Sequence, residues 1–226
     1  MKMNDLKLAA AAIFAAAALT ACGGSSMTAT TSNTASQPEA HGAIETETMP
    51  AEAPKGRFDD VPDLEDGPHL FISETTAKPG DIAEVTISVE NANLKWNMCG
   101  LHIVYPDVLE CQMFNEEDRL VKVKKGEAVD YATGSVCMLW RDNLTDEMKE
   151  KKQKSVFFTA VLDNNNGQDG AIATYFFKVP EDAVSGTVYP IDYYYQDTDI
   201  FSNQEKDPAF EKYAFKNWTG GSITVE

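Results

Sequence analysis

Hydrophobic and polar residues alternate along most of the chain after residue 68, and this period of two is typical of β-strands. The clearest case is residues 82–90, where Ala83, Val85, Ile87 and Val89 alternate with polar or exposed-type positions. A turn at residues 78–81, Lys-Pro-Gly-Asp, precedes this strand. After a polar link, a second strand covers about residues 96–105 and ends at Pro106, whose nitrogen cannot donate a hydrogen bond. This stretch predicts two neighbouring antiparallel strands.

The rest of the pattern predicts an all-β domain. Further strands are expected at residues 70–73, 108–114, 120–123, 131–141, 155–162, 171–179, 187–196 and 222–225. Residues 142–154 predict a turn or one short helix, and residues 207–215 a second short helix. About nine strands that do not alternate with helices predict a two-sheet β-sandwich with short helical insertions.

The first 21 residues have the layout of an export signal. Lys2 and Lys7 precede an apolar run from Leu8 to Leu19, which is too short to favour spanning a membrane. The ending Leu-Thr-Ala-Cys at residues 19–22 resembles the lipobox of bacterial lipoproteins, which implies that Cys22 becomes the lipidated first residue. The alternative is ordinary cleavage near Ala21, which leaves Cys22 as a free thiol. Residues 1–21 are therefore assigned to a lipoprotein signal peptide.

Residues 22–68 are predicted to form a flexible linker, and residues 69–226 the folded domain. The linker is rich in Ser, Thr, Ala, Pro and Glu and has few large apolar residues, so it cannot bury enough surface to offset the entropy of ordering. Its nine acidic residues outnumber Lys55 and Arg57, for a net charge of −7. Mutual repulsion of these charges extends the linker and holds the domain away from the membrane.

Net charge and cysteine content restrict the classes of partner and of metal site that the protein can have. A formal net charge of −17 argues against nucleic acid as a partner, because phosphates require clustered Lys and Arg. Beyond Cys22 the chain has Cys99, Cys111 and Cys137, so at most one disulfide forms among them and at least one thiol stays free. No cysteine or histidine spacing suggests zinc, and buried cysteines that act as small hydrophobic residues are the favoured interpretation.

Four segments follow one another along the folded domain: the turn at residues 78–81 with its strand and Asn91, GLHIVYPDVLE at residues 100–110, DGAIATYFFKV at residues 169–179, and AVSGT at residues 183–187. In this order they resemble segments of the cohesin family, the receptor modules of bacterial cellulosomes. The match spans about residues 70–226. Pro106-Asp107 stands where the family has Asp-Pro, and the long segment 197–218 implies a divergent subtype.

The resemblance implies a nine-stranded jelly-roll sandwich that binds a dockerin, a small calcium-loaded helical module carried by enzymes or scaffoldins. In the family, one sheet face built from the third, fifth, sixth and eighth strands receives a dockerin helix. Binding then rests on flat apolar contact with a hydrogen-bonded rim. The protein is accordingly expected to be no enzyme and to need no cofactor or metal of its own, with calcium belonging to the dockerin.

The resemblance also indicates which residues face the dockerin. If Tyr105 points inward, as its family equivalent does, then Cys99, Leu101 and Ile103 point inward too. The outward, dockerin-binding set on this strand is then Met98, Gly100, His102 and Val104. Outward apolar residues suggest a contact surface. The opposite register would make His102 a core residue instead.

Three other strands supply candidates for the same face. On residues 131–141 we expect Leu139 and Arg141 on the binding face and Trp140 in the core. On residues 155–162, Phe157 and Thr159 share one side, and the family match puts Thr159 outward. Tyr194 is the candidate from the eighth strand, although each of the tyrosines at 193–195 could equally be a core ring.

Calcium binding and catalysis find no support in the sequence. The stretch DNNNGQDG at residues 163–170 does not place ligands and glycine as a calcium loop requires, so a hairpin loop is predicted. His102 is the one histidine within the predicted strands, and no pair of carboxylates is singled out for glycoside hydrolysis.

The sequence thus predicts a lipid-anchored receptor on the extracellular face of the membrane that tethers dockerin-bearing cellulosomal proteins. Its partners would be a dockerin-containing enzyme or scaffoldin and, through Cys22, the membrane. The alternative is a surface carbohydrate-binding module of the same sandwich architecture, with Trp96, Trp140, Trp218 or the tyrosines stacking on sugar rings. A coplanar strip of exposed aromatic residues would distinguish the second function from the first.

Overall fold

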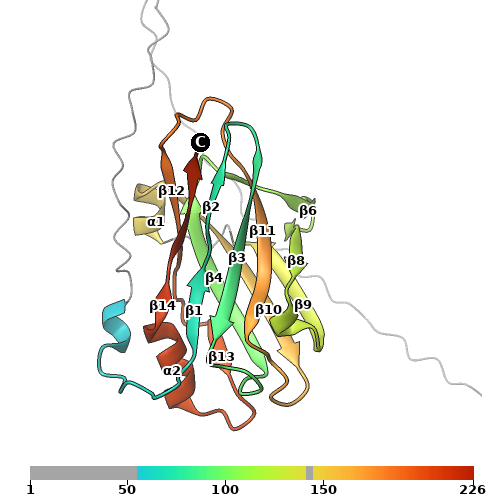
Figure 1. Ribbon diagram of the computed structural model, residues 1–226, viewed down its shortest axis with the longest axis vertical. Coiled ribbons are helices and arrows are strands. Elements are labelled where there is room, and N and C mark those ends of the chain that lie inside the picture. The colour runs from blue at the N-terminus through green and yellow to red at the C-terminus, as the bar shows by residue number, and fades with distance from the viewer. Residues whose placement is uncertain (1–54, 141–144) are drawn as a thin grey trace, which may run out of the picture. The chain divides into compact units, whose positions relative to one another are not determined.

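The computed structural model describes residues 55–140 and 145–226. Within these residues, fifteen strands form one sheet of six strands and one of nine, which pack face to face (Figure 1). The predicted all-β jelly-roll sandwich with short helical insertions is confirmed. The signal peptide, Cys22 and most of the predicted linker lie outside the described residues.

The six-stranded sheet runs in the order β14-β1-β3-β11-β5, and β8 also pairs with β11. Its strands are β1 (His69–Ile72), β3 (Ile82–Glu90), β5 (Glu110–Cys111), β8 (Val123–Lys125), β11 (Gly170–Lys178) and β14 (Trp218–Thr219). The predicted turn before β3 is present: the Asp81 amide donates to the Lys78 carbonyl oxygen over 3.0 Å, and Gly80 has a φ of 81°. Glycine suits that angle because it has no Cβ to clash.

The nine-stranded sheet runs β2-β15-β12-β4-β10-β9-β7-β6, with β13 also paired to β4. Its strands are β2 (Glu74–Ala77), β4 (Met98–Pro106), β6 (Met113–Asn115), β7 (Leu120–Val121), β9 (Ala132–Leu139), β10 (Gln153–Leu162), β12 (Val188–Tyr193), β13 (Ile200–Ser202) and β15 (Gly221–Val225). Strands β12, β4, β10 and β9 lie side by side, and these are the strands on which the candidate residues were predicted.

The structure has more strands than the sequence predicted, because some predicted strands divide into two strands that lie in different sheets. Residues 108–114 divide into β5 and β6, and residues 120–123 contribute to β7 and β8, each pair split between the two sheets. The two points at which the chain passes between the sheets are joined by a hydrogen bond: the Lys122 amide donates to the Gln112 carbonyl oxygen over 2.8 Å. Residues 163–169 also pass from β10 in one sheet to β11 in the other, so the predicted hairpin loop is wrong.

Four short helices accompany the sheets: η1 (Lys55–Phe58), η2 (Glu127–Val129), α1 (Asp146–Glu150) and α2 (Pro208–Lys216), the first two being 3₁₀ helices. Both α-helices begin where an N-cap side chain accepts a backbone hydrogen bond, Thr145 for α1 and Asp207 for α2. The predicted helix at residues 207–215 is confirmed. Helix α2 and η1 lie together at the end of the sandwich opposite the C-terminus (Figure 1).

The folded part begins earlier than the predicted boundary at residue 69. Phe58 is 4% exposed and packs in the core cluster, and Gly67 and Pro68 are buried. The flexible linker predicted for residues 22–68 is therefore wrong for its last part. Phe58 and Val61 both pack against the core, and burial of their apolar surface attaches this stretch to the domain.

Candidate binding face

The candidate face is the outer side of β12, β4, β10 and β9. Strand register places outward positions in three rows across β4, β10 and β9: His102 with Phe157 and Met138, Gly100 with Thr159 and Val136, and Met98 with Val161 and Gly134. The inward positions of β4, which are Cys99, Leu101, Ile103 and Tyr105, are fully buried between the sheets. The predicted register of β4 is therefore correct, although Pro106-Asp107 departs from the family pattern.

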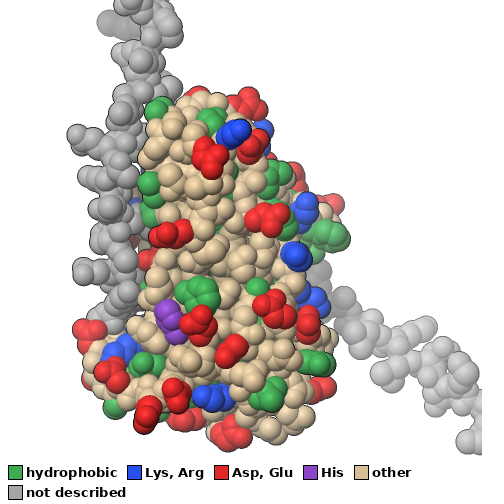
Figure 2. Space-filling view, in the orientation of Figure 1, with side chains coloured by type: hydrophobic (Ala, Val, Ile, Leu, Met, Phe, Trp, Pro, Cys, Tyr) green, Lys and Arg blue, Asp and Glu red, His purple; other side chains and the backbone are tan. Residues whose placement is uncertain are grey.

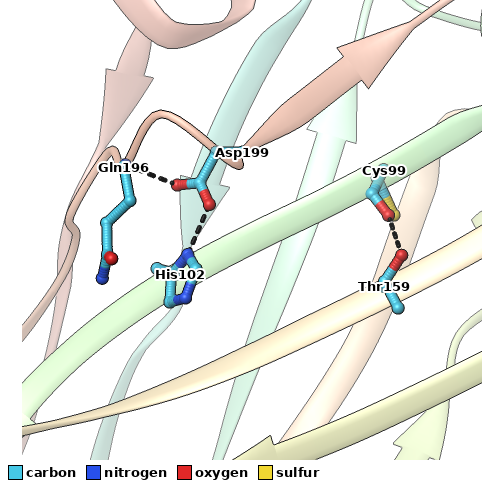
Figure 3. Close-up of polar contacts among 5 residues, drawn as sticks. All are labelled: Cys99, His102, Thr159, Gln196 and Asp199. Atoms are coloured by element: carbon cyan, nitrogen blue, oxygen red, sulfur yellow. Dashed lines mark hydrogen bonds and ion pairs between the residues drawn. The ribbon is translucent and has the colours of Figure 1, made fainter. Parts of the chain in front are cut away.

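His102 points outward as predicted, but it is buried, with 1% of its surface exposed. Its ring lies 4.6 Å from that of Phe157 and 4.9 Å from that of Trp140. A hydrogen bond joins Nδ1 of His102 to a carboxylate oxygen of Asp199, while Nε2 has no hydrogen-bond partner among the described residues (Figure 3). Its role as a direct contact is therefore wrong, because other outer-face side chains cover it.

Val104, also predicted as a contact, is buried on the same outer side. Val104 and Met148 of α1 are both buried, and neither belongs to the core cluster between the sheets. The Thr145 hydroxyl at the start of α1 and the Tyr194 hydroxyl are 3.2 Å apart and share a hydrogen bond. Helix α1 packs against β10, the burial of Val104 removes it from contact, and Tyr194 is half-buried.

The predicted orientations of Leu139 and Trp140 are inverted. Leu139 is 8% exposed, lies in the core cluster and pairs with inward Val156. Trp140 is half-buried and packs its ring on His102 and, at 5.3 Å, on Phe157. The alternation on β9 was ambiguous because both of its sides are largely apolar. Arg141 lies outside the described residues.

The open part of the face surrounds the Met98 end of β4. Met98, Phe157 and Thr159 are half-buried, and Val161 is 40% exposed. Thr159 donates its hydroxyl to the Cys99 carbonyl oxygen over 2.8 Å, so its polar atom is already satisfied (Figure 3). Five half-buried or exposed side chains on this side are apolar, namely Met98, Val136, Met138, Phe157 and Val161.

Two neighbouring side chains occupy the space beside Gly100. A Cβ at this position would lie 3.0 Å from Cζ of Phe157 and 3.1 Å from Cγ2 of Ile200. Ile200 belongs to β13 and pairs directly with Gly100. The apolar surface therefore runs without a gap from β10 across β4 to β13.

Sequence analysis missed Ile200 and Asp199, which the structure adds to the site. Both lie in the long segment 197–218, where a strand of three residues is too short to show a period of two. Burial raises the pKa of Asp199 above the ordinary value for a carboxyl, and the hydrogen bond from His102 opposes this rise.

Among solved structures, the chain is similar to a type III cohesin module from the cellulosomal ScaE cell-surface anchoring scaffoldin of Ruminococcus flavefaciens. The identity is 26%, the TM-score is 0.59, and the match covers 74% of this chain and 94% of that module. The chain has the cohesin fold. The resemblance that the four sequence motifs indicated is thereby confirmed.

Other cohesin structures match less closely. The Coh-OlpA–Doc918 type I cohesin–dockerin complex of Clostridium thermocellum is 16% identical, with a TM-score of 0.49 and coverage of 71% of this chain and 99% of that one. A non-cellulosomal cohesin from Archaeoglobus fulgidus is 15% identical, with a TM-score of 0.46 and coverage of 71% and 91%. No protein-family model and no curated protein matches the chain.

The cohesin-fold domain has no exposed strip of tryptophans in its described part. Trp96 and Trp218 are buried in the core, and Trp140 packs on His102. Tyr193 is buried, and Tyr195 packs against Phe215 at 4.8 Å. The three tryptophans and Tyr193, on which the carbohydrate-binding alternative depended, are therefore not arranged for stacking on sugar rings.

The segment 163–170 has a structural role. The Gly167 amide donates to the Trp96 carbonyl oxygen over 2.9 Å, and Asp169 accepts from the Ala92 amide over 2.7 Å. Within residues 55–140 and 145–226, no group of three or more His, Cys, Asp or Glu side chains is placed to hold a metal ion. Over the same residues, no helix has the length and apolar composition needed to cross a membrane.

A pocket of about 470 Å³ opens beside the covered end of the face, lined by Tyr105, Glu110, Cys111, Met113, Glu116, Leu139, Trp140, Lys154 and Ser155.

Cys99, Cys111 and Cys137 are free and buried. Burial raises the pKa of the Cys99 and Cys111 thiols to about 12, and that of Cys137 also rises. These cysteines behave as the small core residues that the sequence favoured, because thiols that stay protonated are poor nucleophiles.

Proposed function

We propose that this protein is a non-catalytic receptor that binds a dockerin through the open part of the β4–β10–β9 face. The observation that carries the proposal is the apolar surface around Gly100, formed by side chains that are partly exposed on the outer side of β4, β10 and β9. The motifs shared with cohesins and the similarity to a module of a cell-surface anchoring scaffoldin support it.

Binding at this face needs no rearrangement of the backbone. The Thr159 hydroxyl is satisfied within the sheet, so this oxygen stays hydrogen-bonded when an apolar partner surface covers it. An amphipathic helix laid on the face would gain about 25 cal/mol for each Å² of apolar surface removed from water. A rigid, preformed face also keeps the entropy cost of association low.

The rest of the chain fits display at a cell surface. The predicted lipidated Cys22 would hold the protein on the outer side of the membrane, and the acidic segment that follows would extend the domain outward. Dockerin-bearing enzymes or scaffoldins captured there would stay attached to the cell. Binding involves no chemical step, and calcium would belong to the dockerin.

Binding of recombinant calcium-loaded dockerins to the full chain, measured by calorimetry across a panel of them, tests the proposal. At least one dockerin should bind, and adding a calcium chelator should abolish the binding. Val161→Asp should weaken the binding at least tenfold, because it places a charge on the apolar face.

Ile82→Asp is the matched control. Ile82 is 51% exposed on the outer side of the six-stranded sheet, where hydrophobic side chains are scattered among charged ones (Figure 2). It should leave the affinity unchanged. A chain that binds no dockerin of the panel, or binds one equally well after calcium removal, would contradict the proposed function.

The anchor is tested separately. Cells that express the chain with a labelled fatty acid should yield a labelled, membrane-bound protein, and Cys22→Ser should abolish the label. Label that persists in this variant would exclude Cys22 as the lipidated residue while leaving dockerin binding to be judged on its own.

A further inference from the structure

Residues just before β1 pack against the irregular segment that separates β12 from β13. The Phe58 ring lies 4.8 Å from the Tyr195 ring and 6.1 Å from the Phe215 ring. Tyr195 comes from the irregular segment and Phe215 from α2. Phe58 therefore completes a three-ring cluster whose other members lie more than 130 residues later in the chain.

Arg57 contacts the same irregular segment at two points. Its guanidinium lies 5.0 Å from the centre of the Tyr195 ring, and one of its nitrogens lies 2.6 Å from a carboxylate oxygen of Asp197. Both Arg57 and Asp197 are largely exposed, so the ion pair adds at most about 1 kcal/mol. The contacts of Arg57 with Tyr195 and Asp197 together fix the position of the irregular segment relative to the residues before β1.

Helix α2 holds the remainder of this stretch. Lys216 donates to the Val61 carbonyl oxygen over 2.6 Å and to a carboxylate oxygen of Asp63 over 2.7 Å. Gly67 lies so close to Tyr213 that a Cβ on the glycine would be 2.3 Å from a ring carbon. Residues 57–68, called the clamp segment from here on, thus have several separate attachments to the domain.

The irregular segment itself leads to the binding face. Tyr193 pairs with Ile103 and Ile200 with Gly100, so residues 194–199, called the bulge from here on, interrupt the strand beside His102. Asp199 closes the bulge: it bonds to His102, accepts from the Gln196 amide over 3.0 Å, and donates its own amide to the Gln196 carbonyl oxygen over 2.8 Å (Figure 3). Ile200, which extends the apolar face, follows directly.

We propose that the clamp segment is a positioning element of the binding face: by holding the bulge it sets, through Asp199 and His102, the place of Ile200. This inference rests on the proposed function in so far as the face binds a dockerin. The last part of the predicted linker is then part of the dockerin-binding domain. A force applied through the linker would act on the clamp segment before it acts on the sandwich.

Single substitutions in the full chain test the inference, with Phe58→Ala and the milder Arg57→Ala compared with Val225→Ala. Val225 is buried in β15, which pairs with β2 at the end of the sandwich that carries the C-terminus, so it is a control for general loss of stability. Hydrogen exchange reports opening of residues 194–202, and the ¹⁵N shift of His102 Nδ1 reports its bond to Asp199.

In both clamp variants, exchange in residues 194–202 should rise about tenfold or more, and the His102 shift should change. The affinity for the best dockerin of the panel should fall with them. Val225→Ala should alter neither local signal. Unchanged signals in the clamp variants, or equal changes in the control, would overturn the inference. If wild type binds no dockerin, the proposed function fails, and the exchange and shift data still decide whether the clamp positions the bulge.

Discussion

His102 and Asp199 are 97 residues apart in the chain and form a buried hydrogen bond on the outer side of the sheet. The bond lies where β12 has ended and β13 has not yet begun. Hydrogen bonds along the sheet are interrupted there, so a bond between side chains keeps the two half-strands in line with β4. Tyr195 and Asp197 in the same bulge link this point to Arg57.

Asp199→Asn should change how stability depends on pH. Burial raises the pKa of Asp199, so the folded protein binds this proton more tightly than the unfolded chain does. The stability contributed by such an acid is fully present below its unfolded pKa and is lost as the pH rises through its folded pKa. Relative to the variant, the free energy of unfolding of the wild type should therefore decline from about pH 4 upward.

Urea denaturation of both proteins at a series of pH values measures this difference. The amide oxygen of Asn can still accept a hydrogen bond from His102, so the variant keeps the shape of the site. A difference that grows with pH would mean instead that His102 holds the carboxylate ionised, with a lowered pKa for Asp199.

Leu139→Glu should unfold the protein or destabilise it by about 3 kcal/mol or more. Leu139 belongs to the core cluster and is 8% exposed, so a carboxylate there loses most of its contact with water. Val161→Glu, on the open face, should cost less than about 1 kcal/mol. Thermal unfolding of the two variants measures the contrast, and a well-folded Leu139→Glu protein would show that the side chain faces outward after all.

The orientation of β9 was the weakest part of the sequence-based prediction for a physical reason. On β4, inward residues could be identified because Tyr105 matched a family position and the period of two did the rest. On β9, Val136, Met138 and Trp140 on one side are as apolar as Cys137 and Leu139 on the other. Hydrophobic patterning cannot orient a strand whose outer side is itself a contact surface or is covered.

The fold was easier to predict than the exposure of its residues. Alternation along β3 identified that strand, and four motifs in the right order indicated the likeness to cohesins. Whether an outward side chain stays accessible depends on distant segments: Asp199 contacts His102, and Val104 is buried although it points outward. Their placement follows from tertiary contacts, which strand patterning does not contain. The packing of Phe58 was missed likewise, because the polar composition of its stretch assigned it to the linker.

The three buried thiols should be almost inert in the folded protein. At pH 8 a thiol with a pKa of about 12 is ionised about 10³-fold less than an ordinary cysteine, and only the thiolate reacts quickly. Labelling of Cys99, Cys111 and Cys137 by iodoacetamide, followed by mass spectrometry, should therefore proceed only through opening of the fold. Denaturant should restore ordinary rates, and rapid labelling of any one of them in the folded state would contradict its burial.

Two glycines on the outer face should respond oppositely to a methyl group. At Gly134 a Cβ meets nothing within 4 Å, so Gly134→Ala should stabilise the protein by about 0.5 kcal/mol, since alanine loses less backbone entropy on folding. At Gly100 the new Cβ meets Phe157 and Ile200 at 3.0 and 3.1 Å, so both must move apart. Gly100→Ala should therefore bring no gain in stability.

The two substitutions should also differ in their effect on the affinity for a dockerin. Gly100→Ala should weaken binding, because the new Cβ displaces Phe157 and Ile200 on the apolar face, whereas Gly134→Ala should leave the affinity within about twofold of wild type. Chemical denaturation and calorimetry of the same two proteins give both quantities. Equal effects of the two alanines on affinity would place the contact surface away from Gly100, even if a dockerin binds.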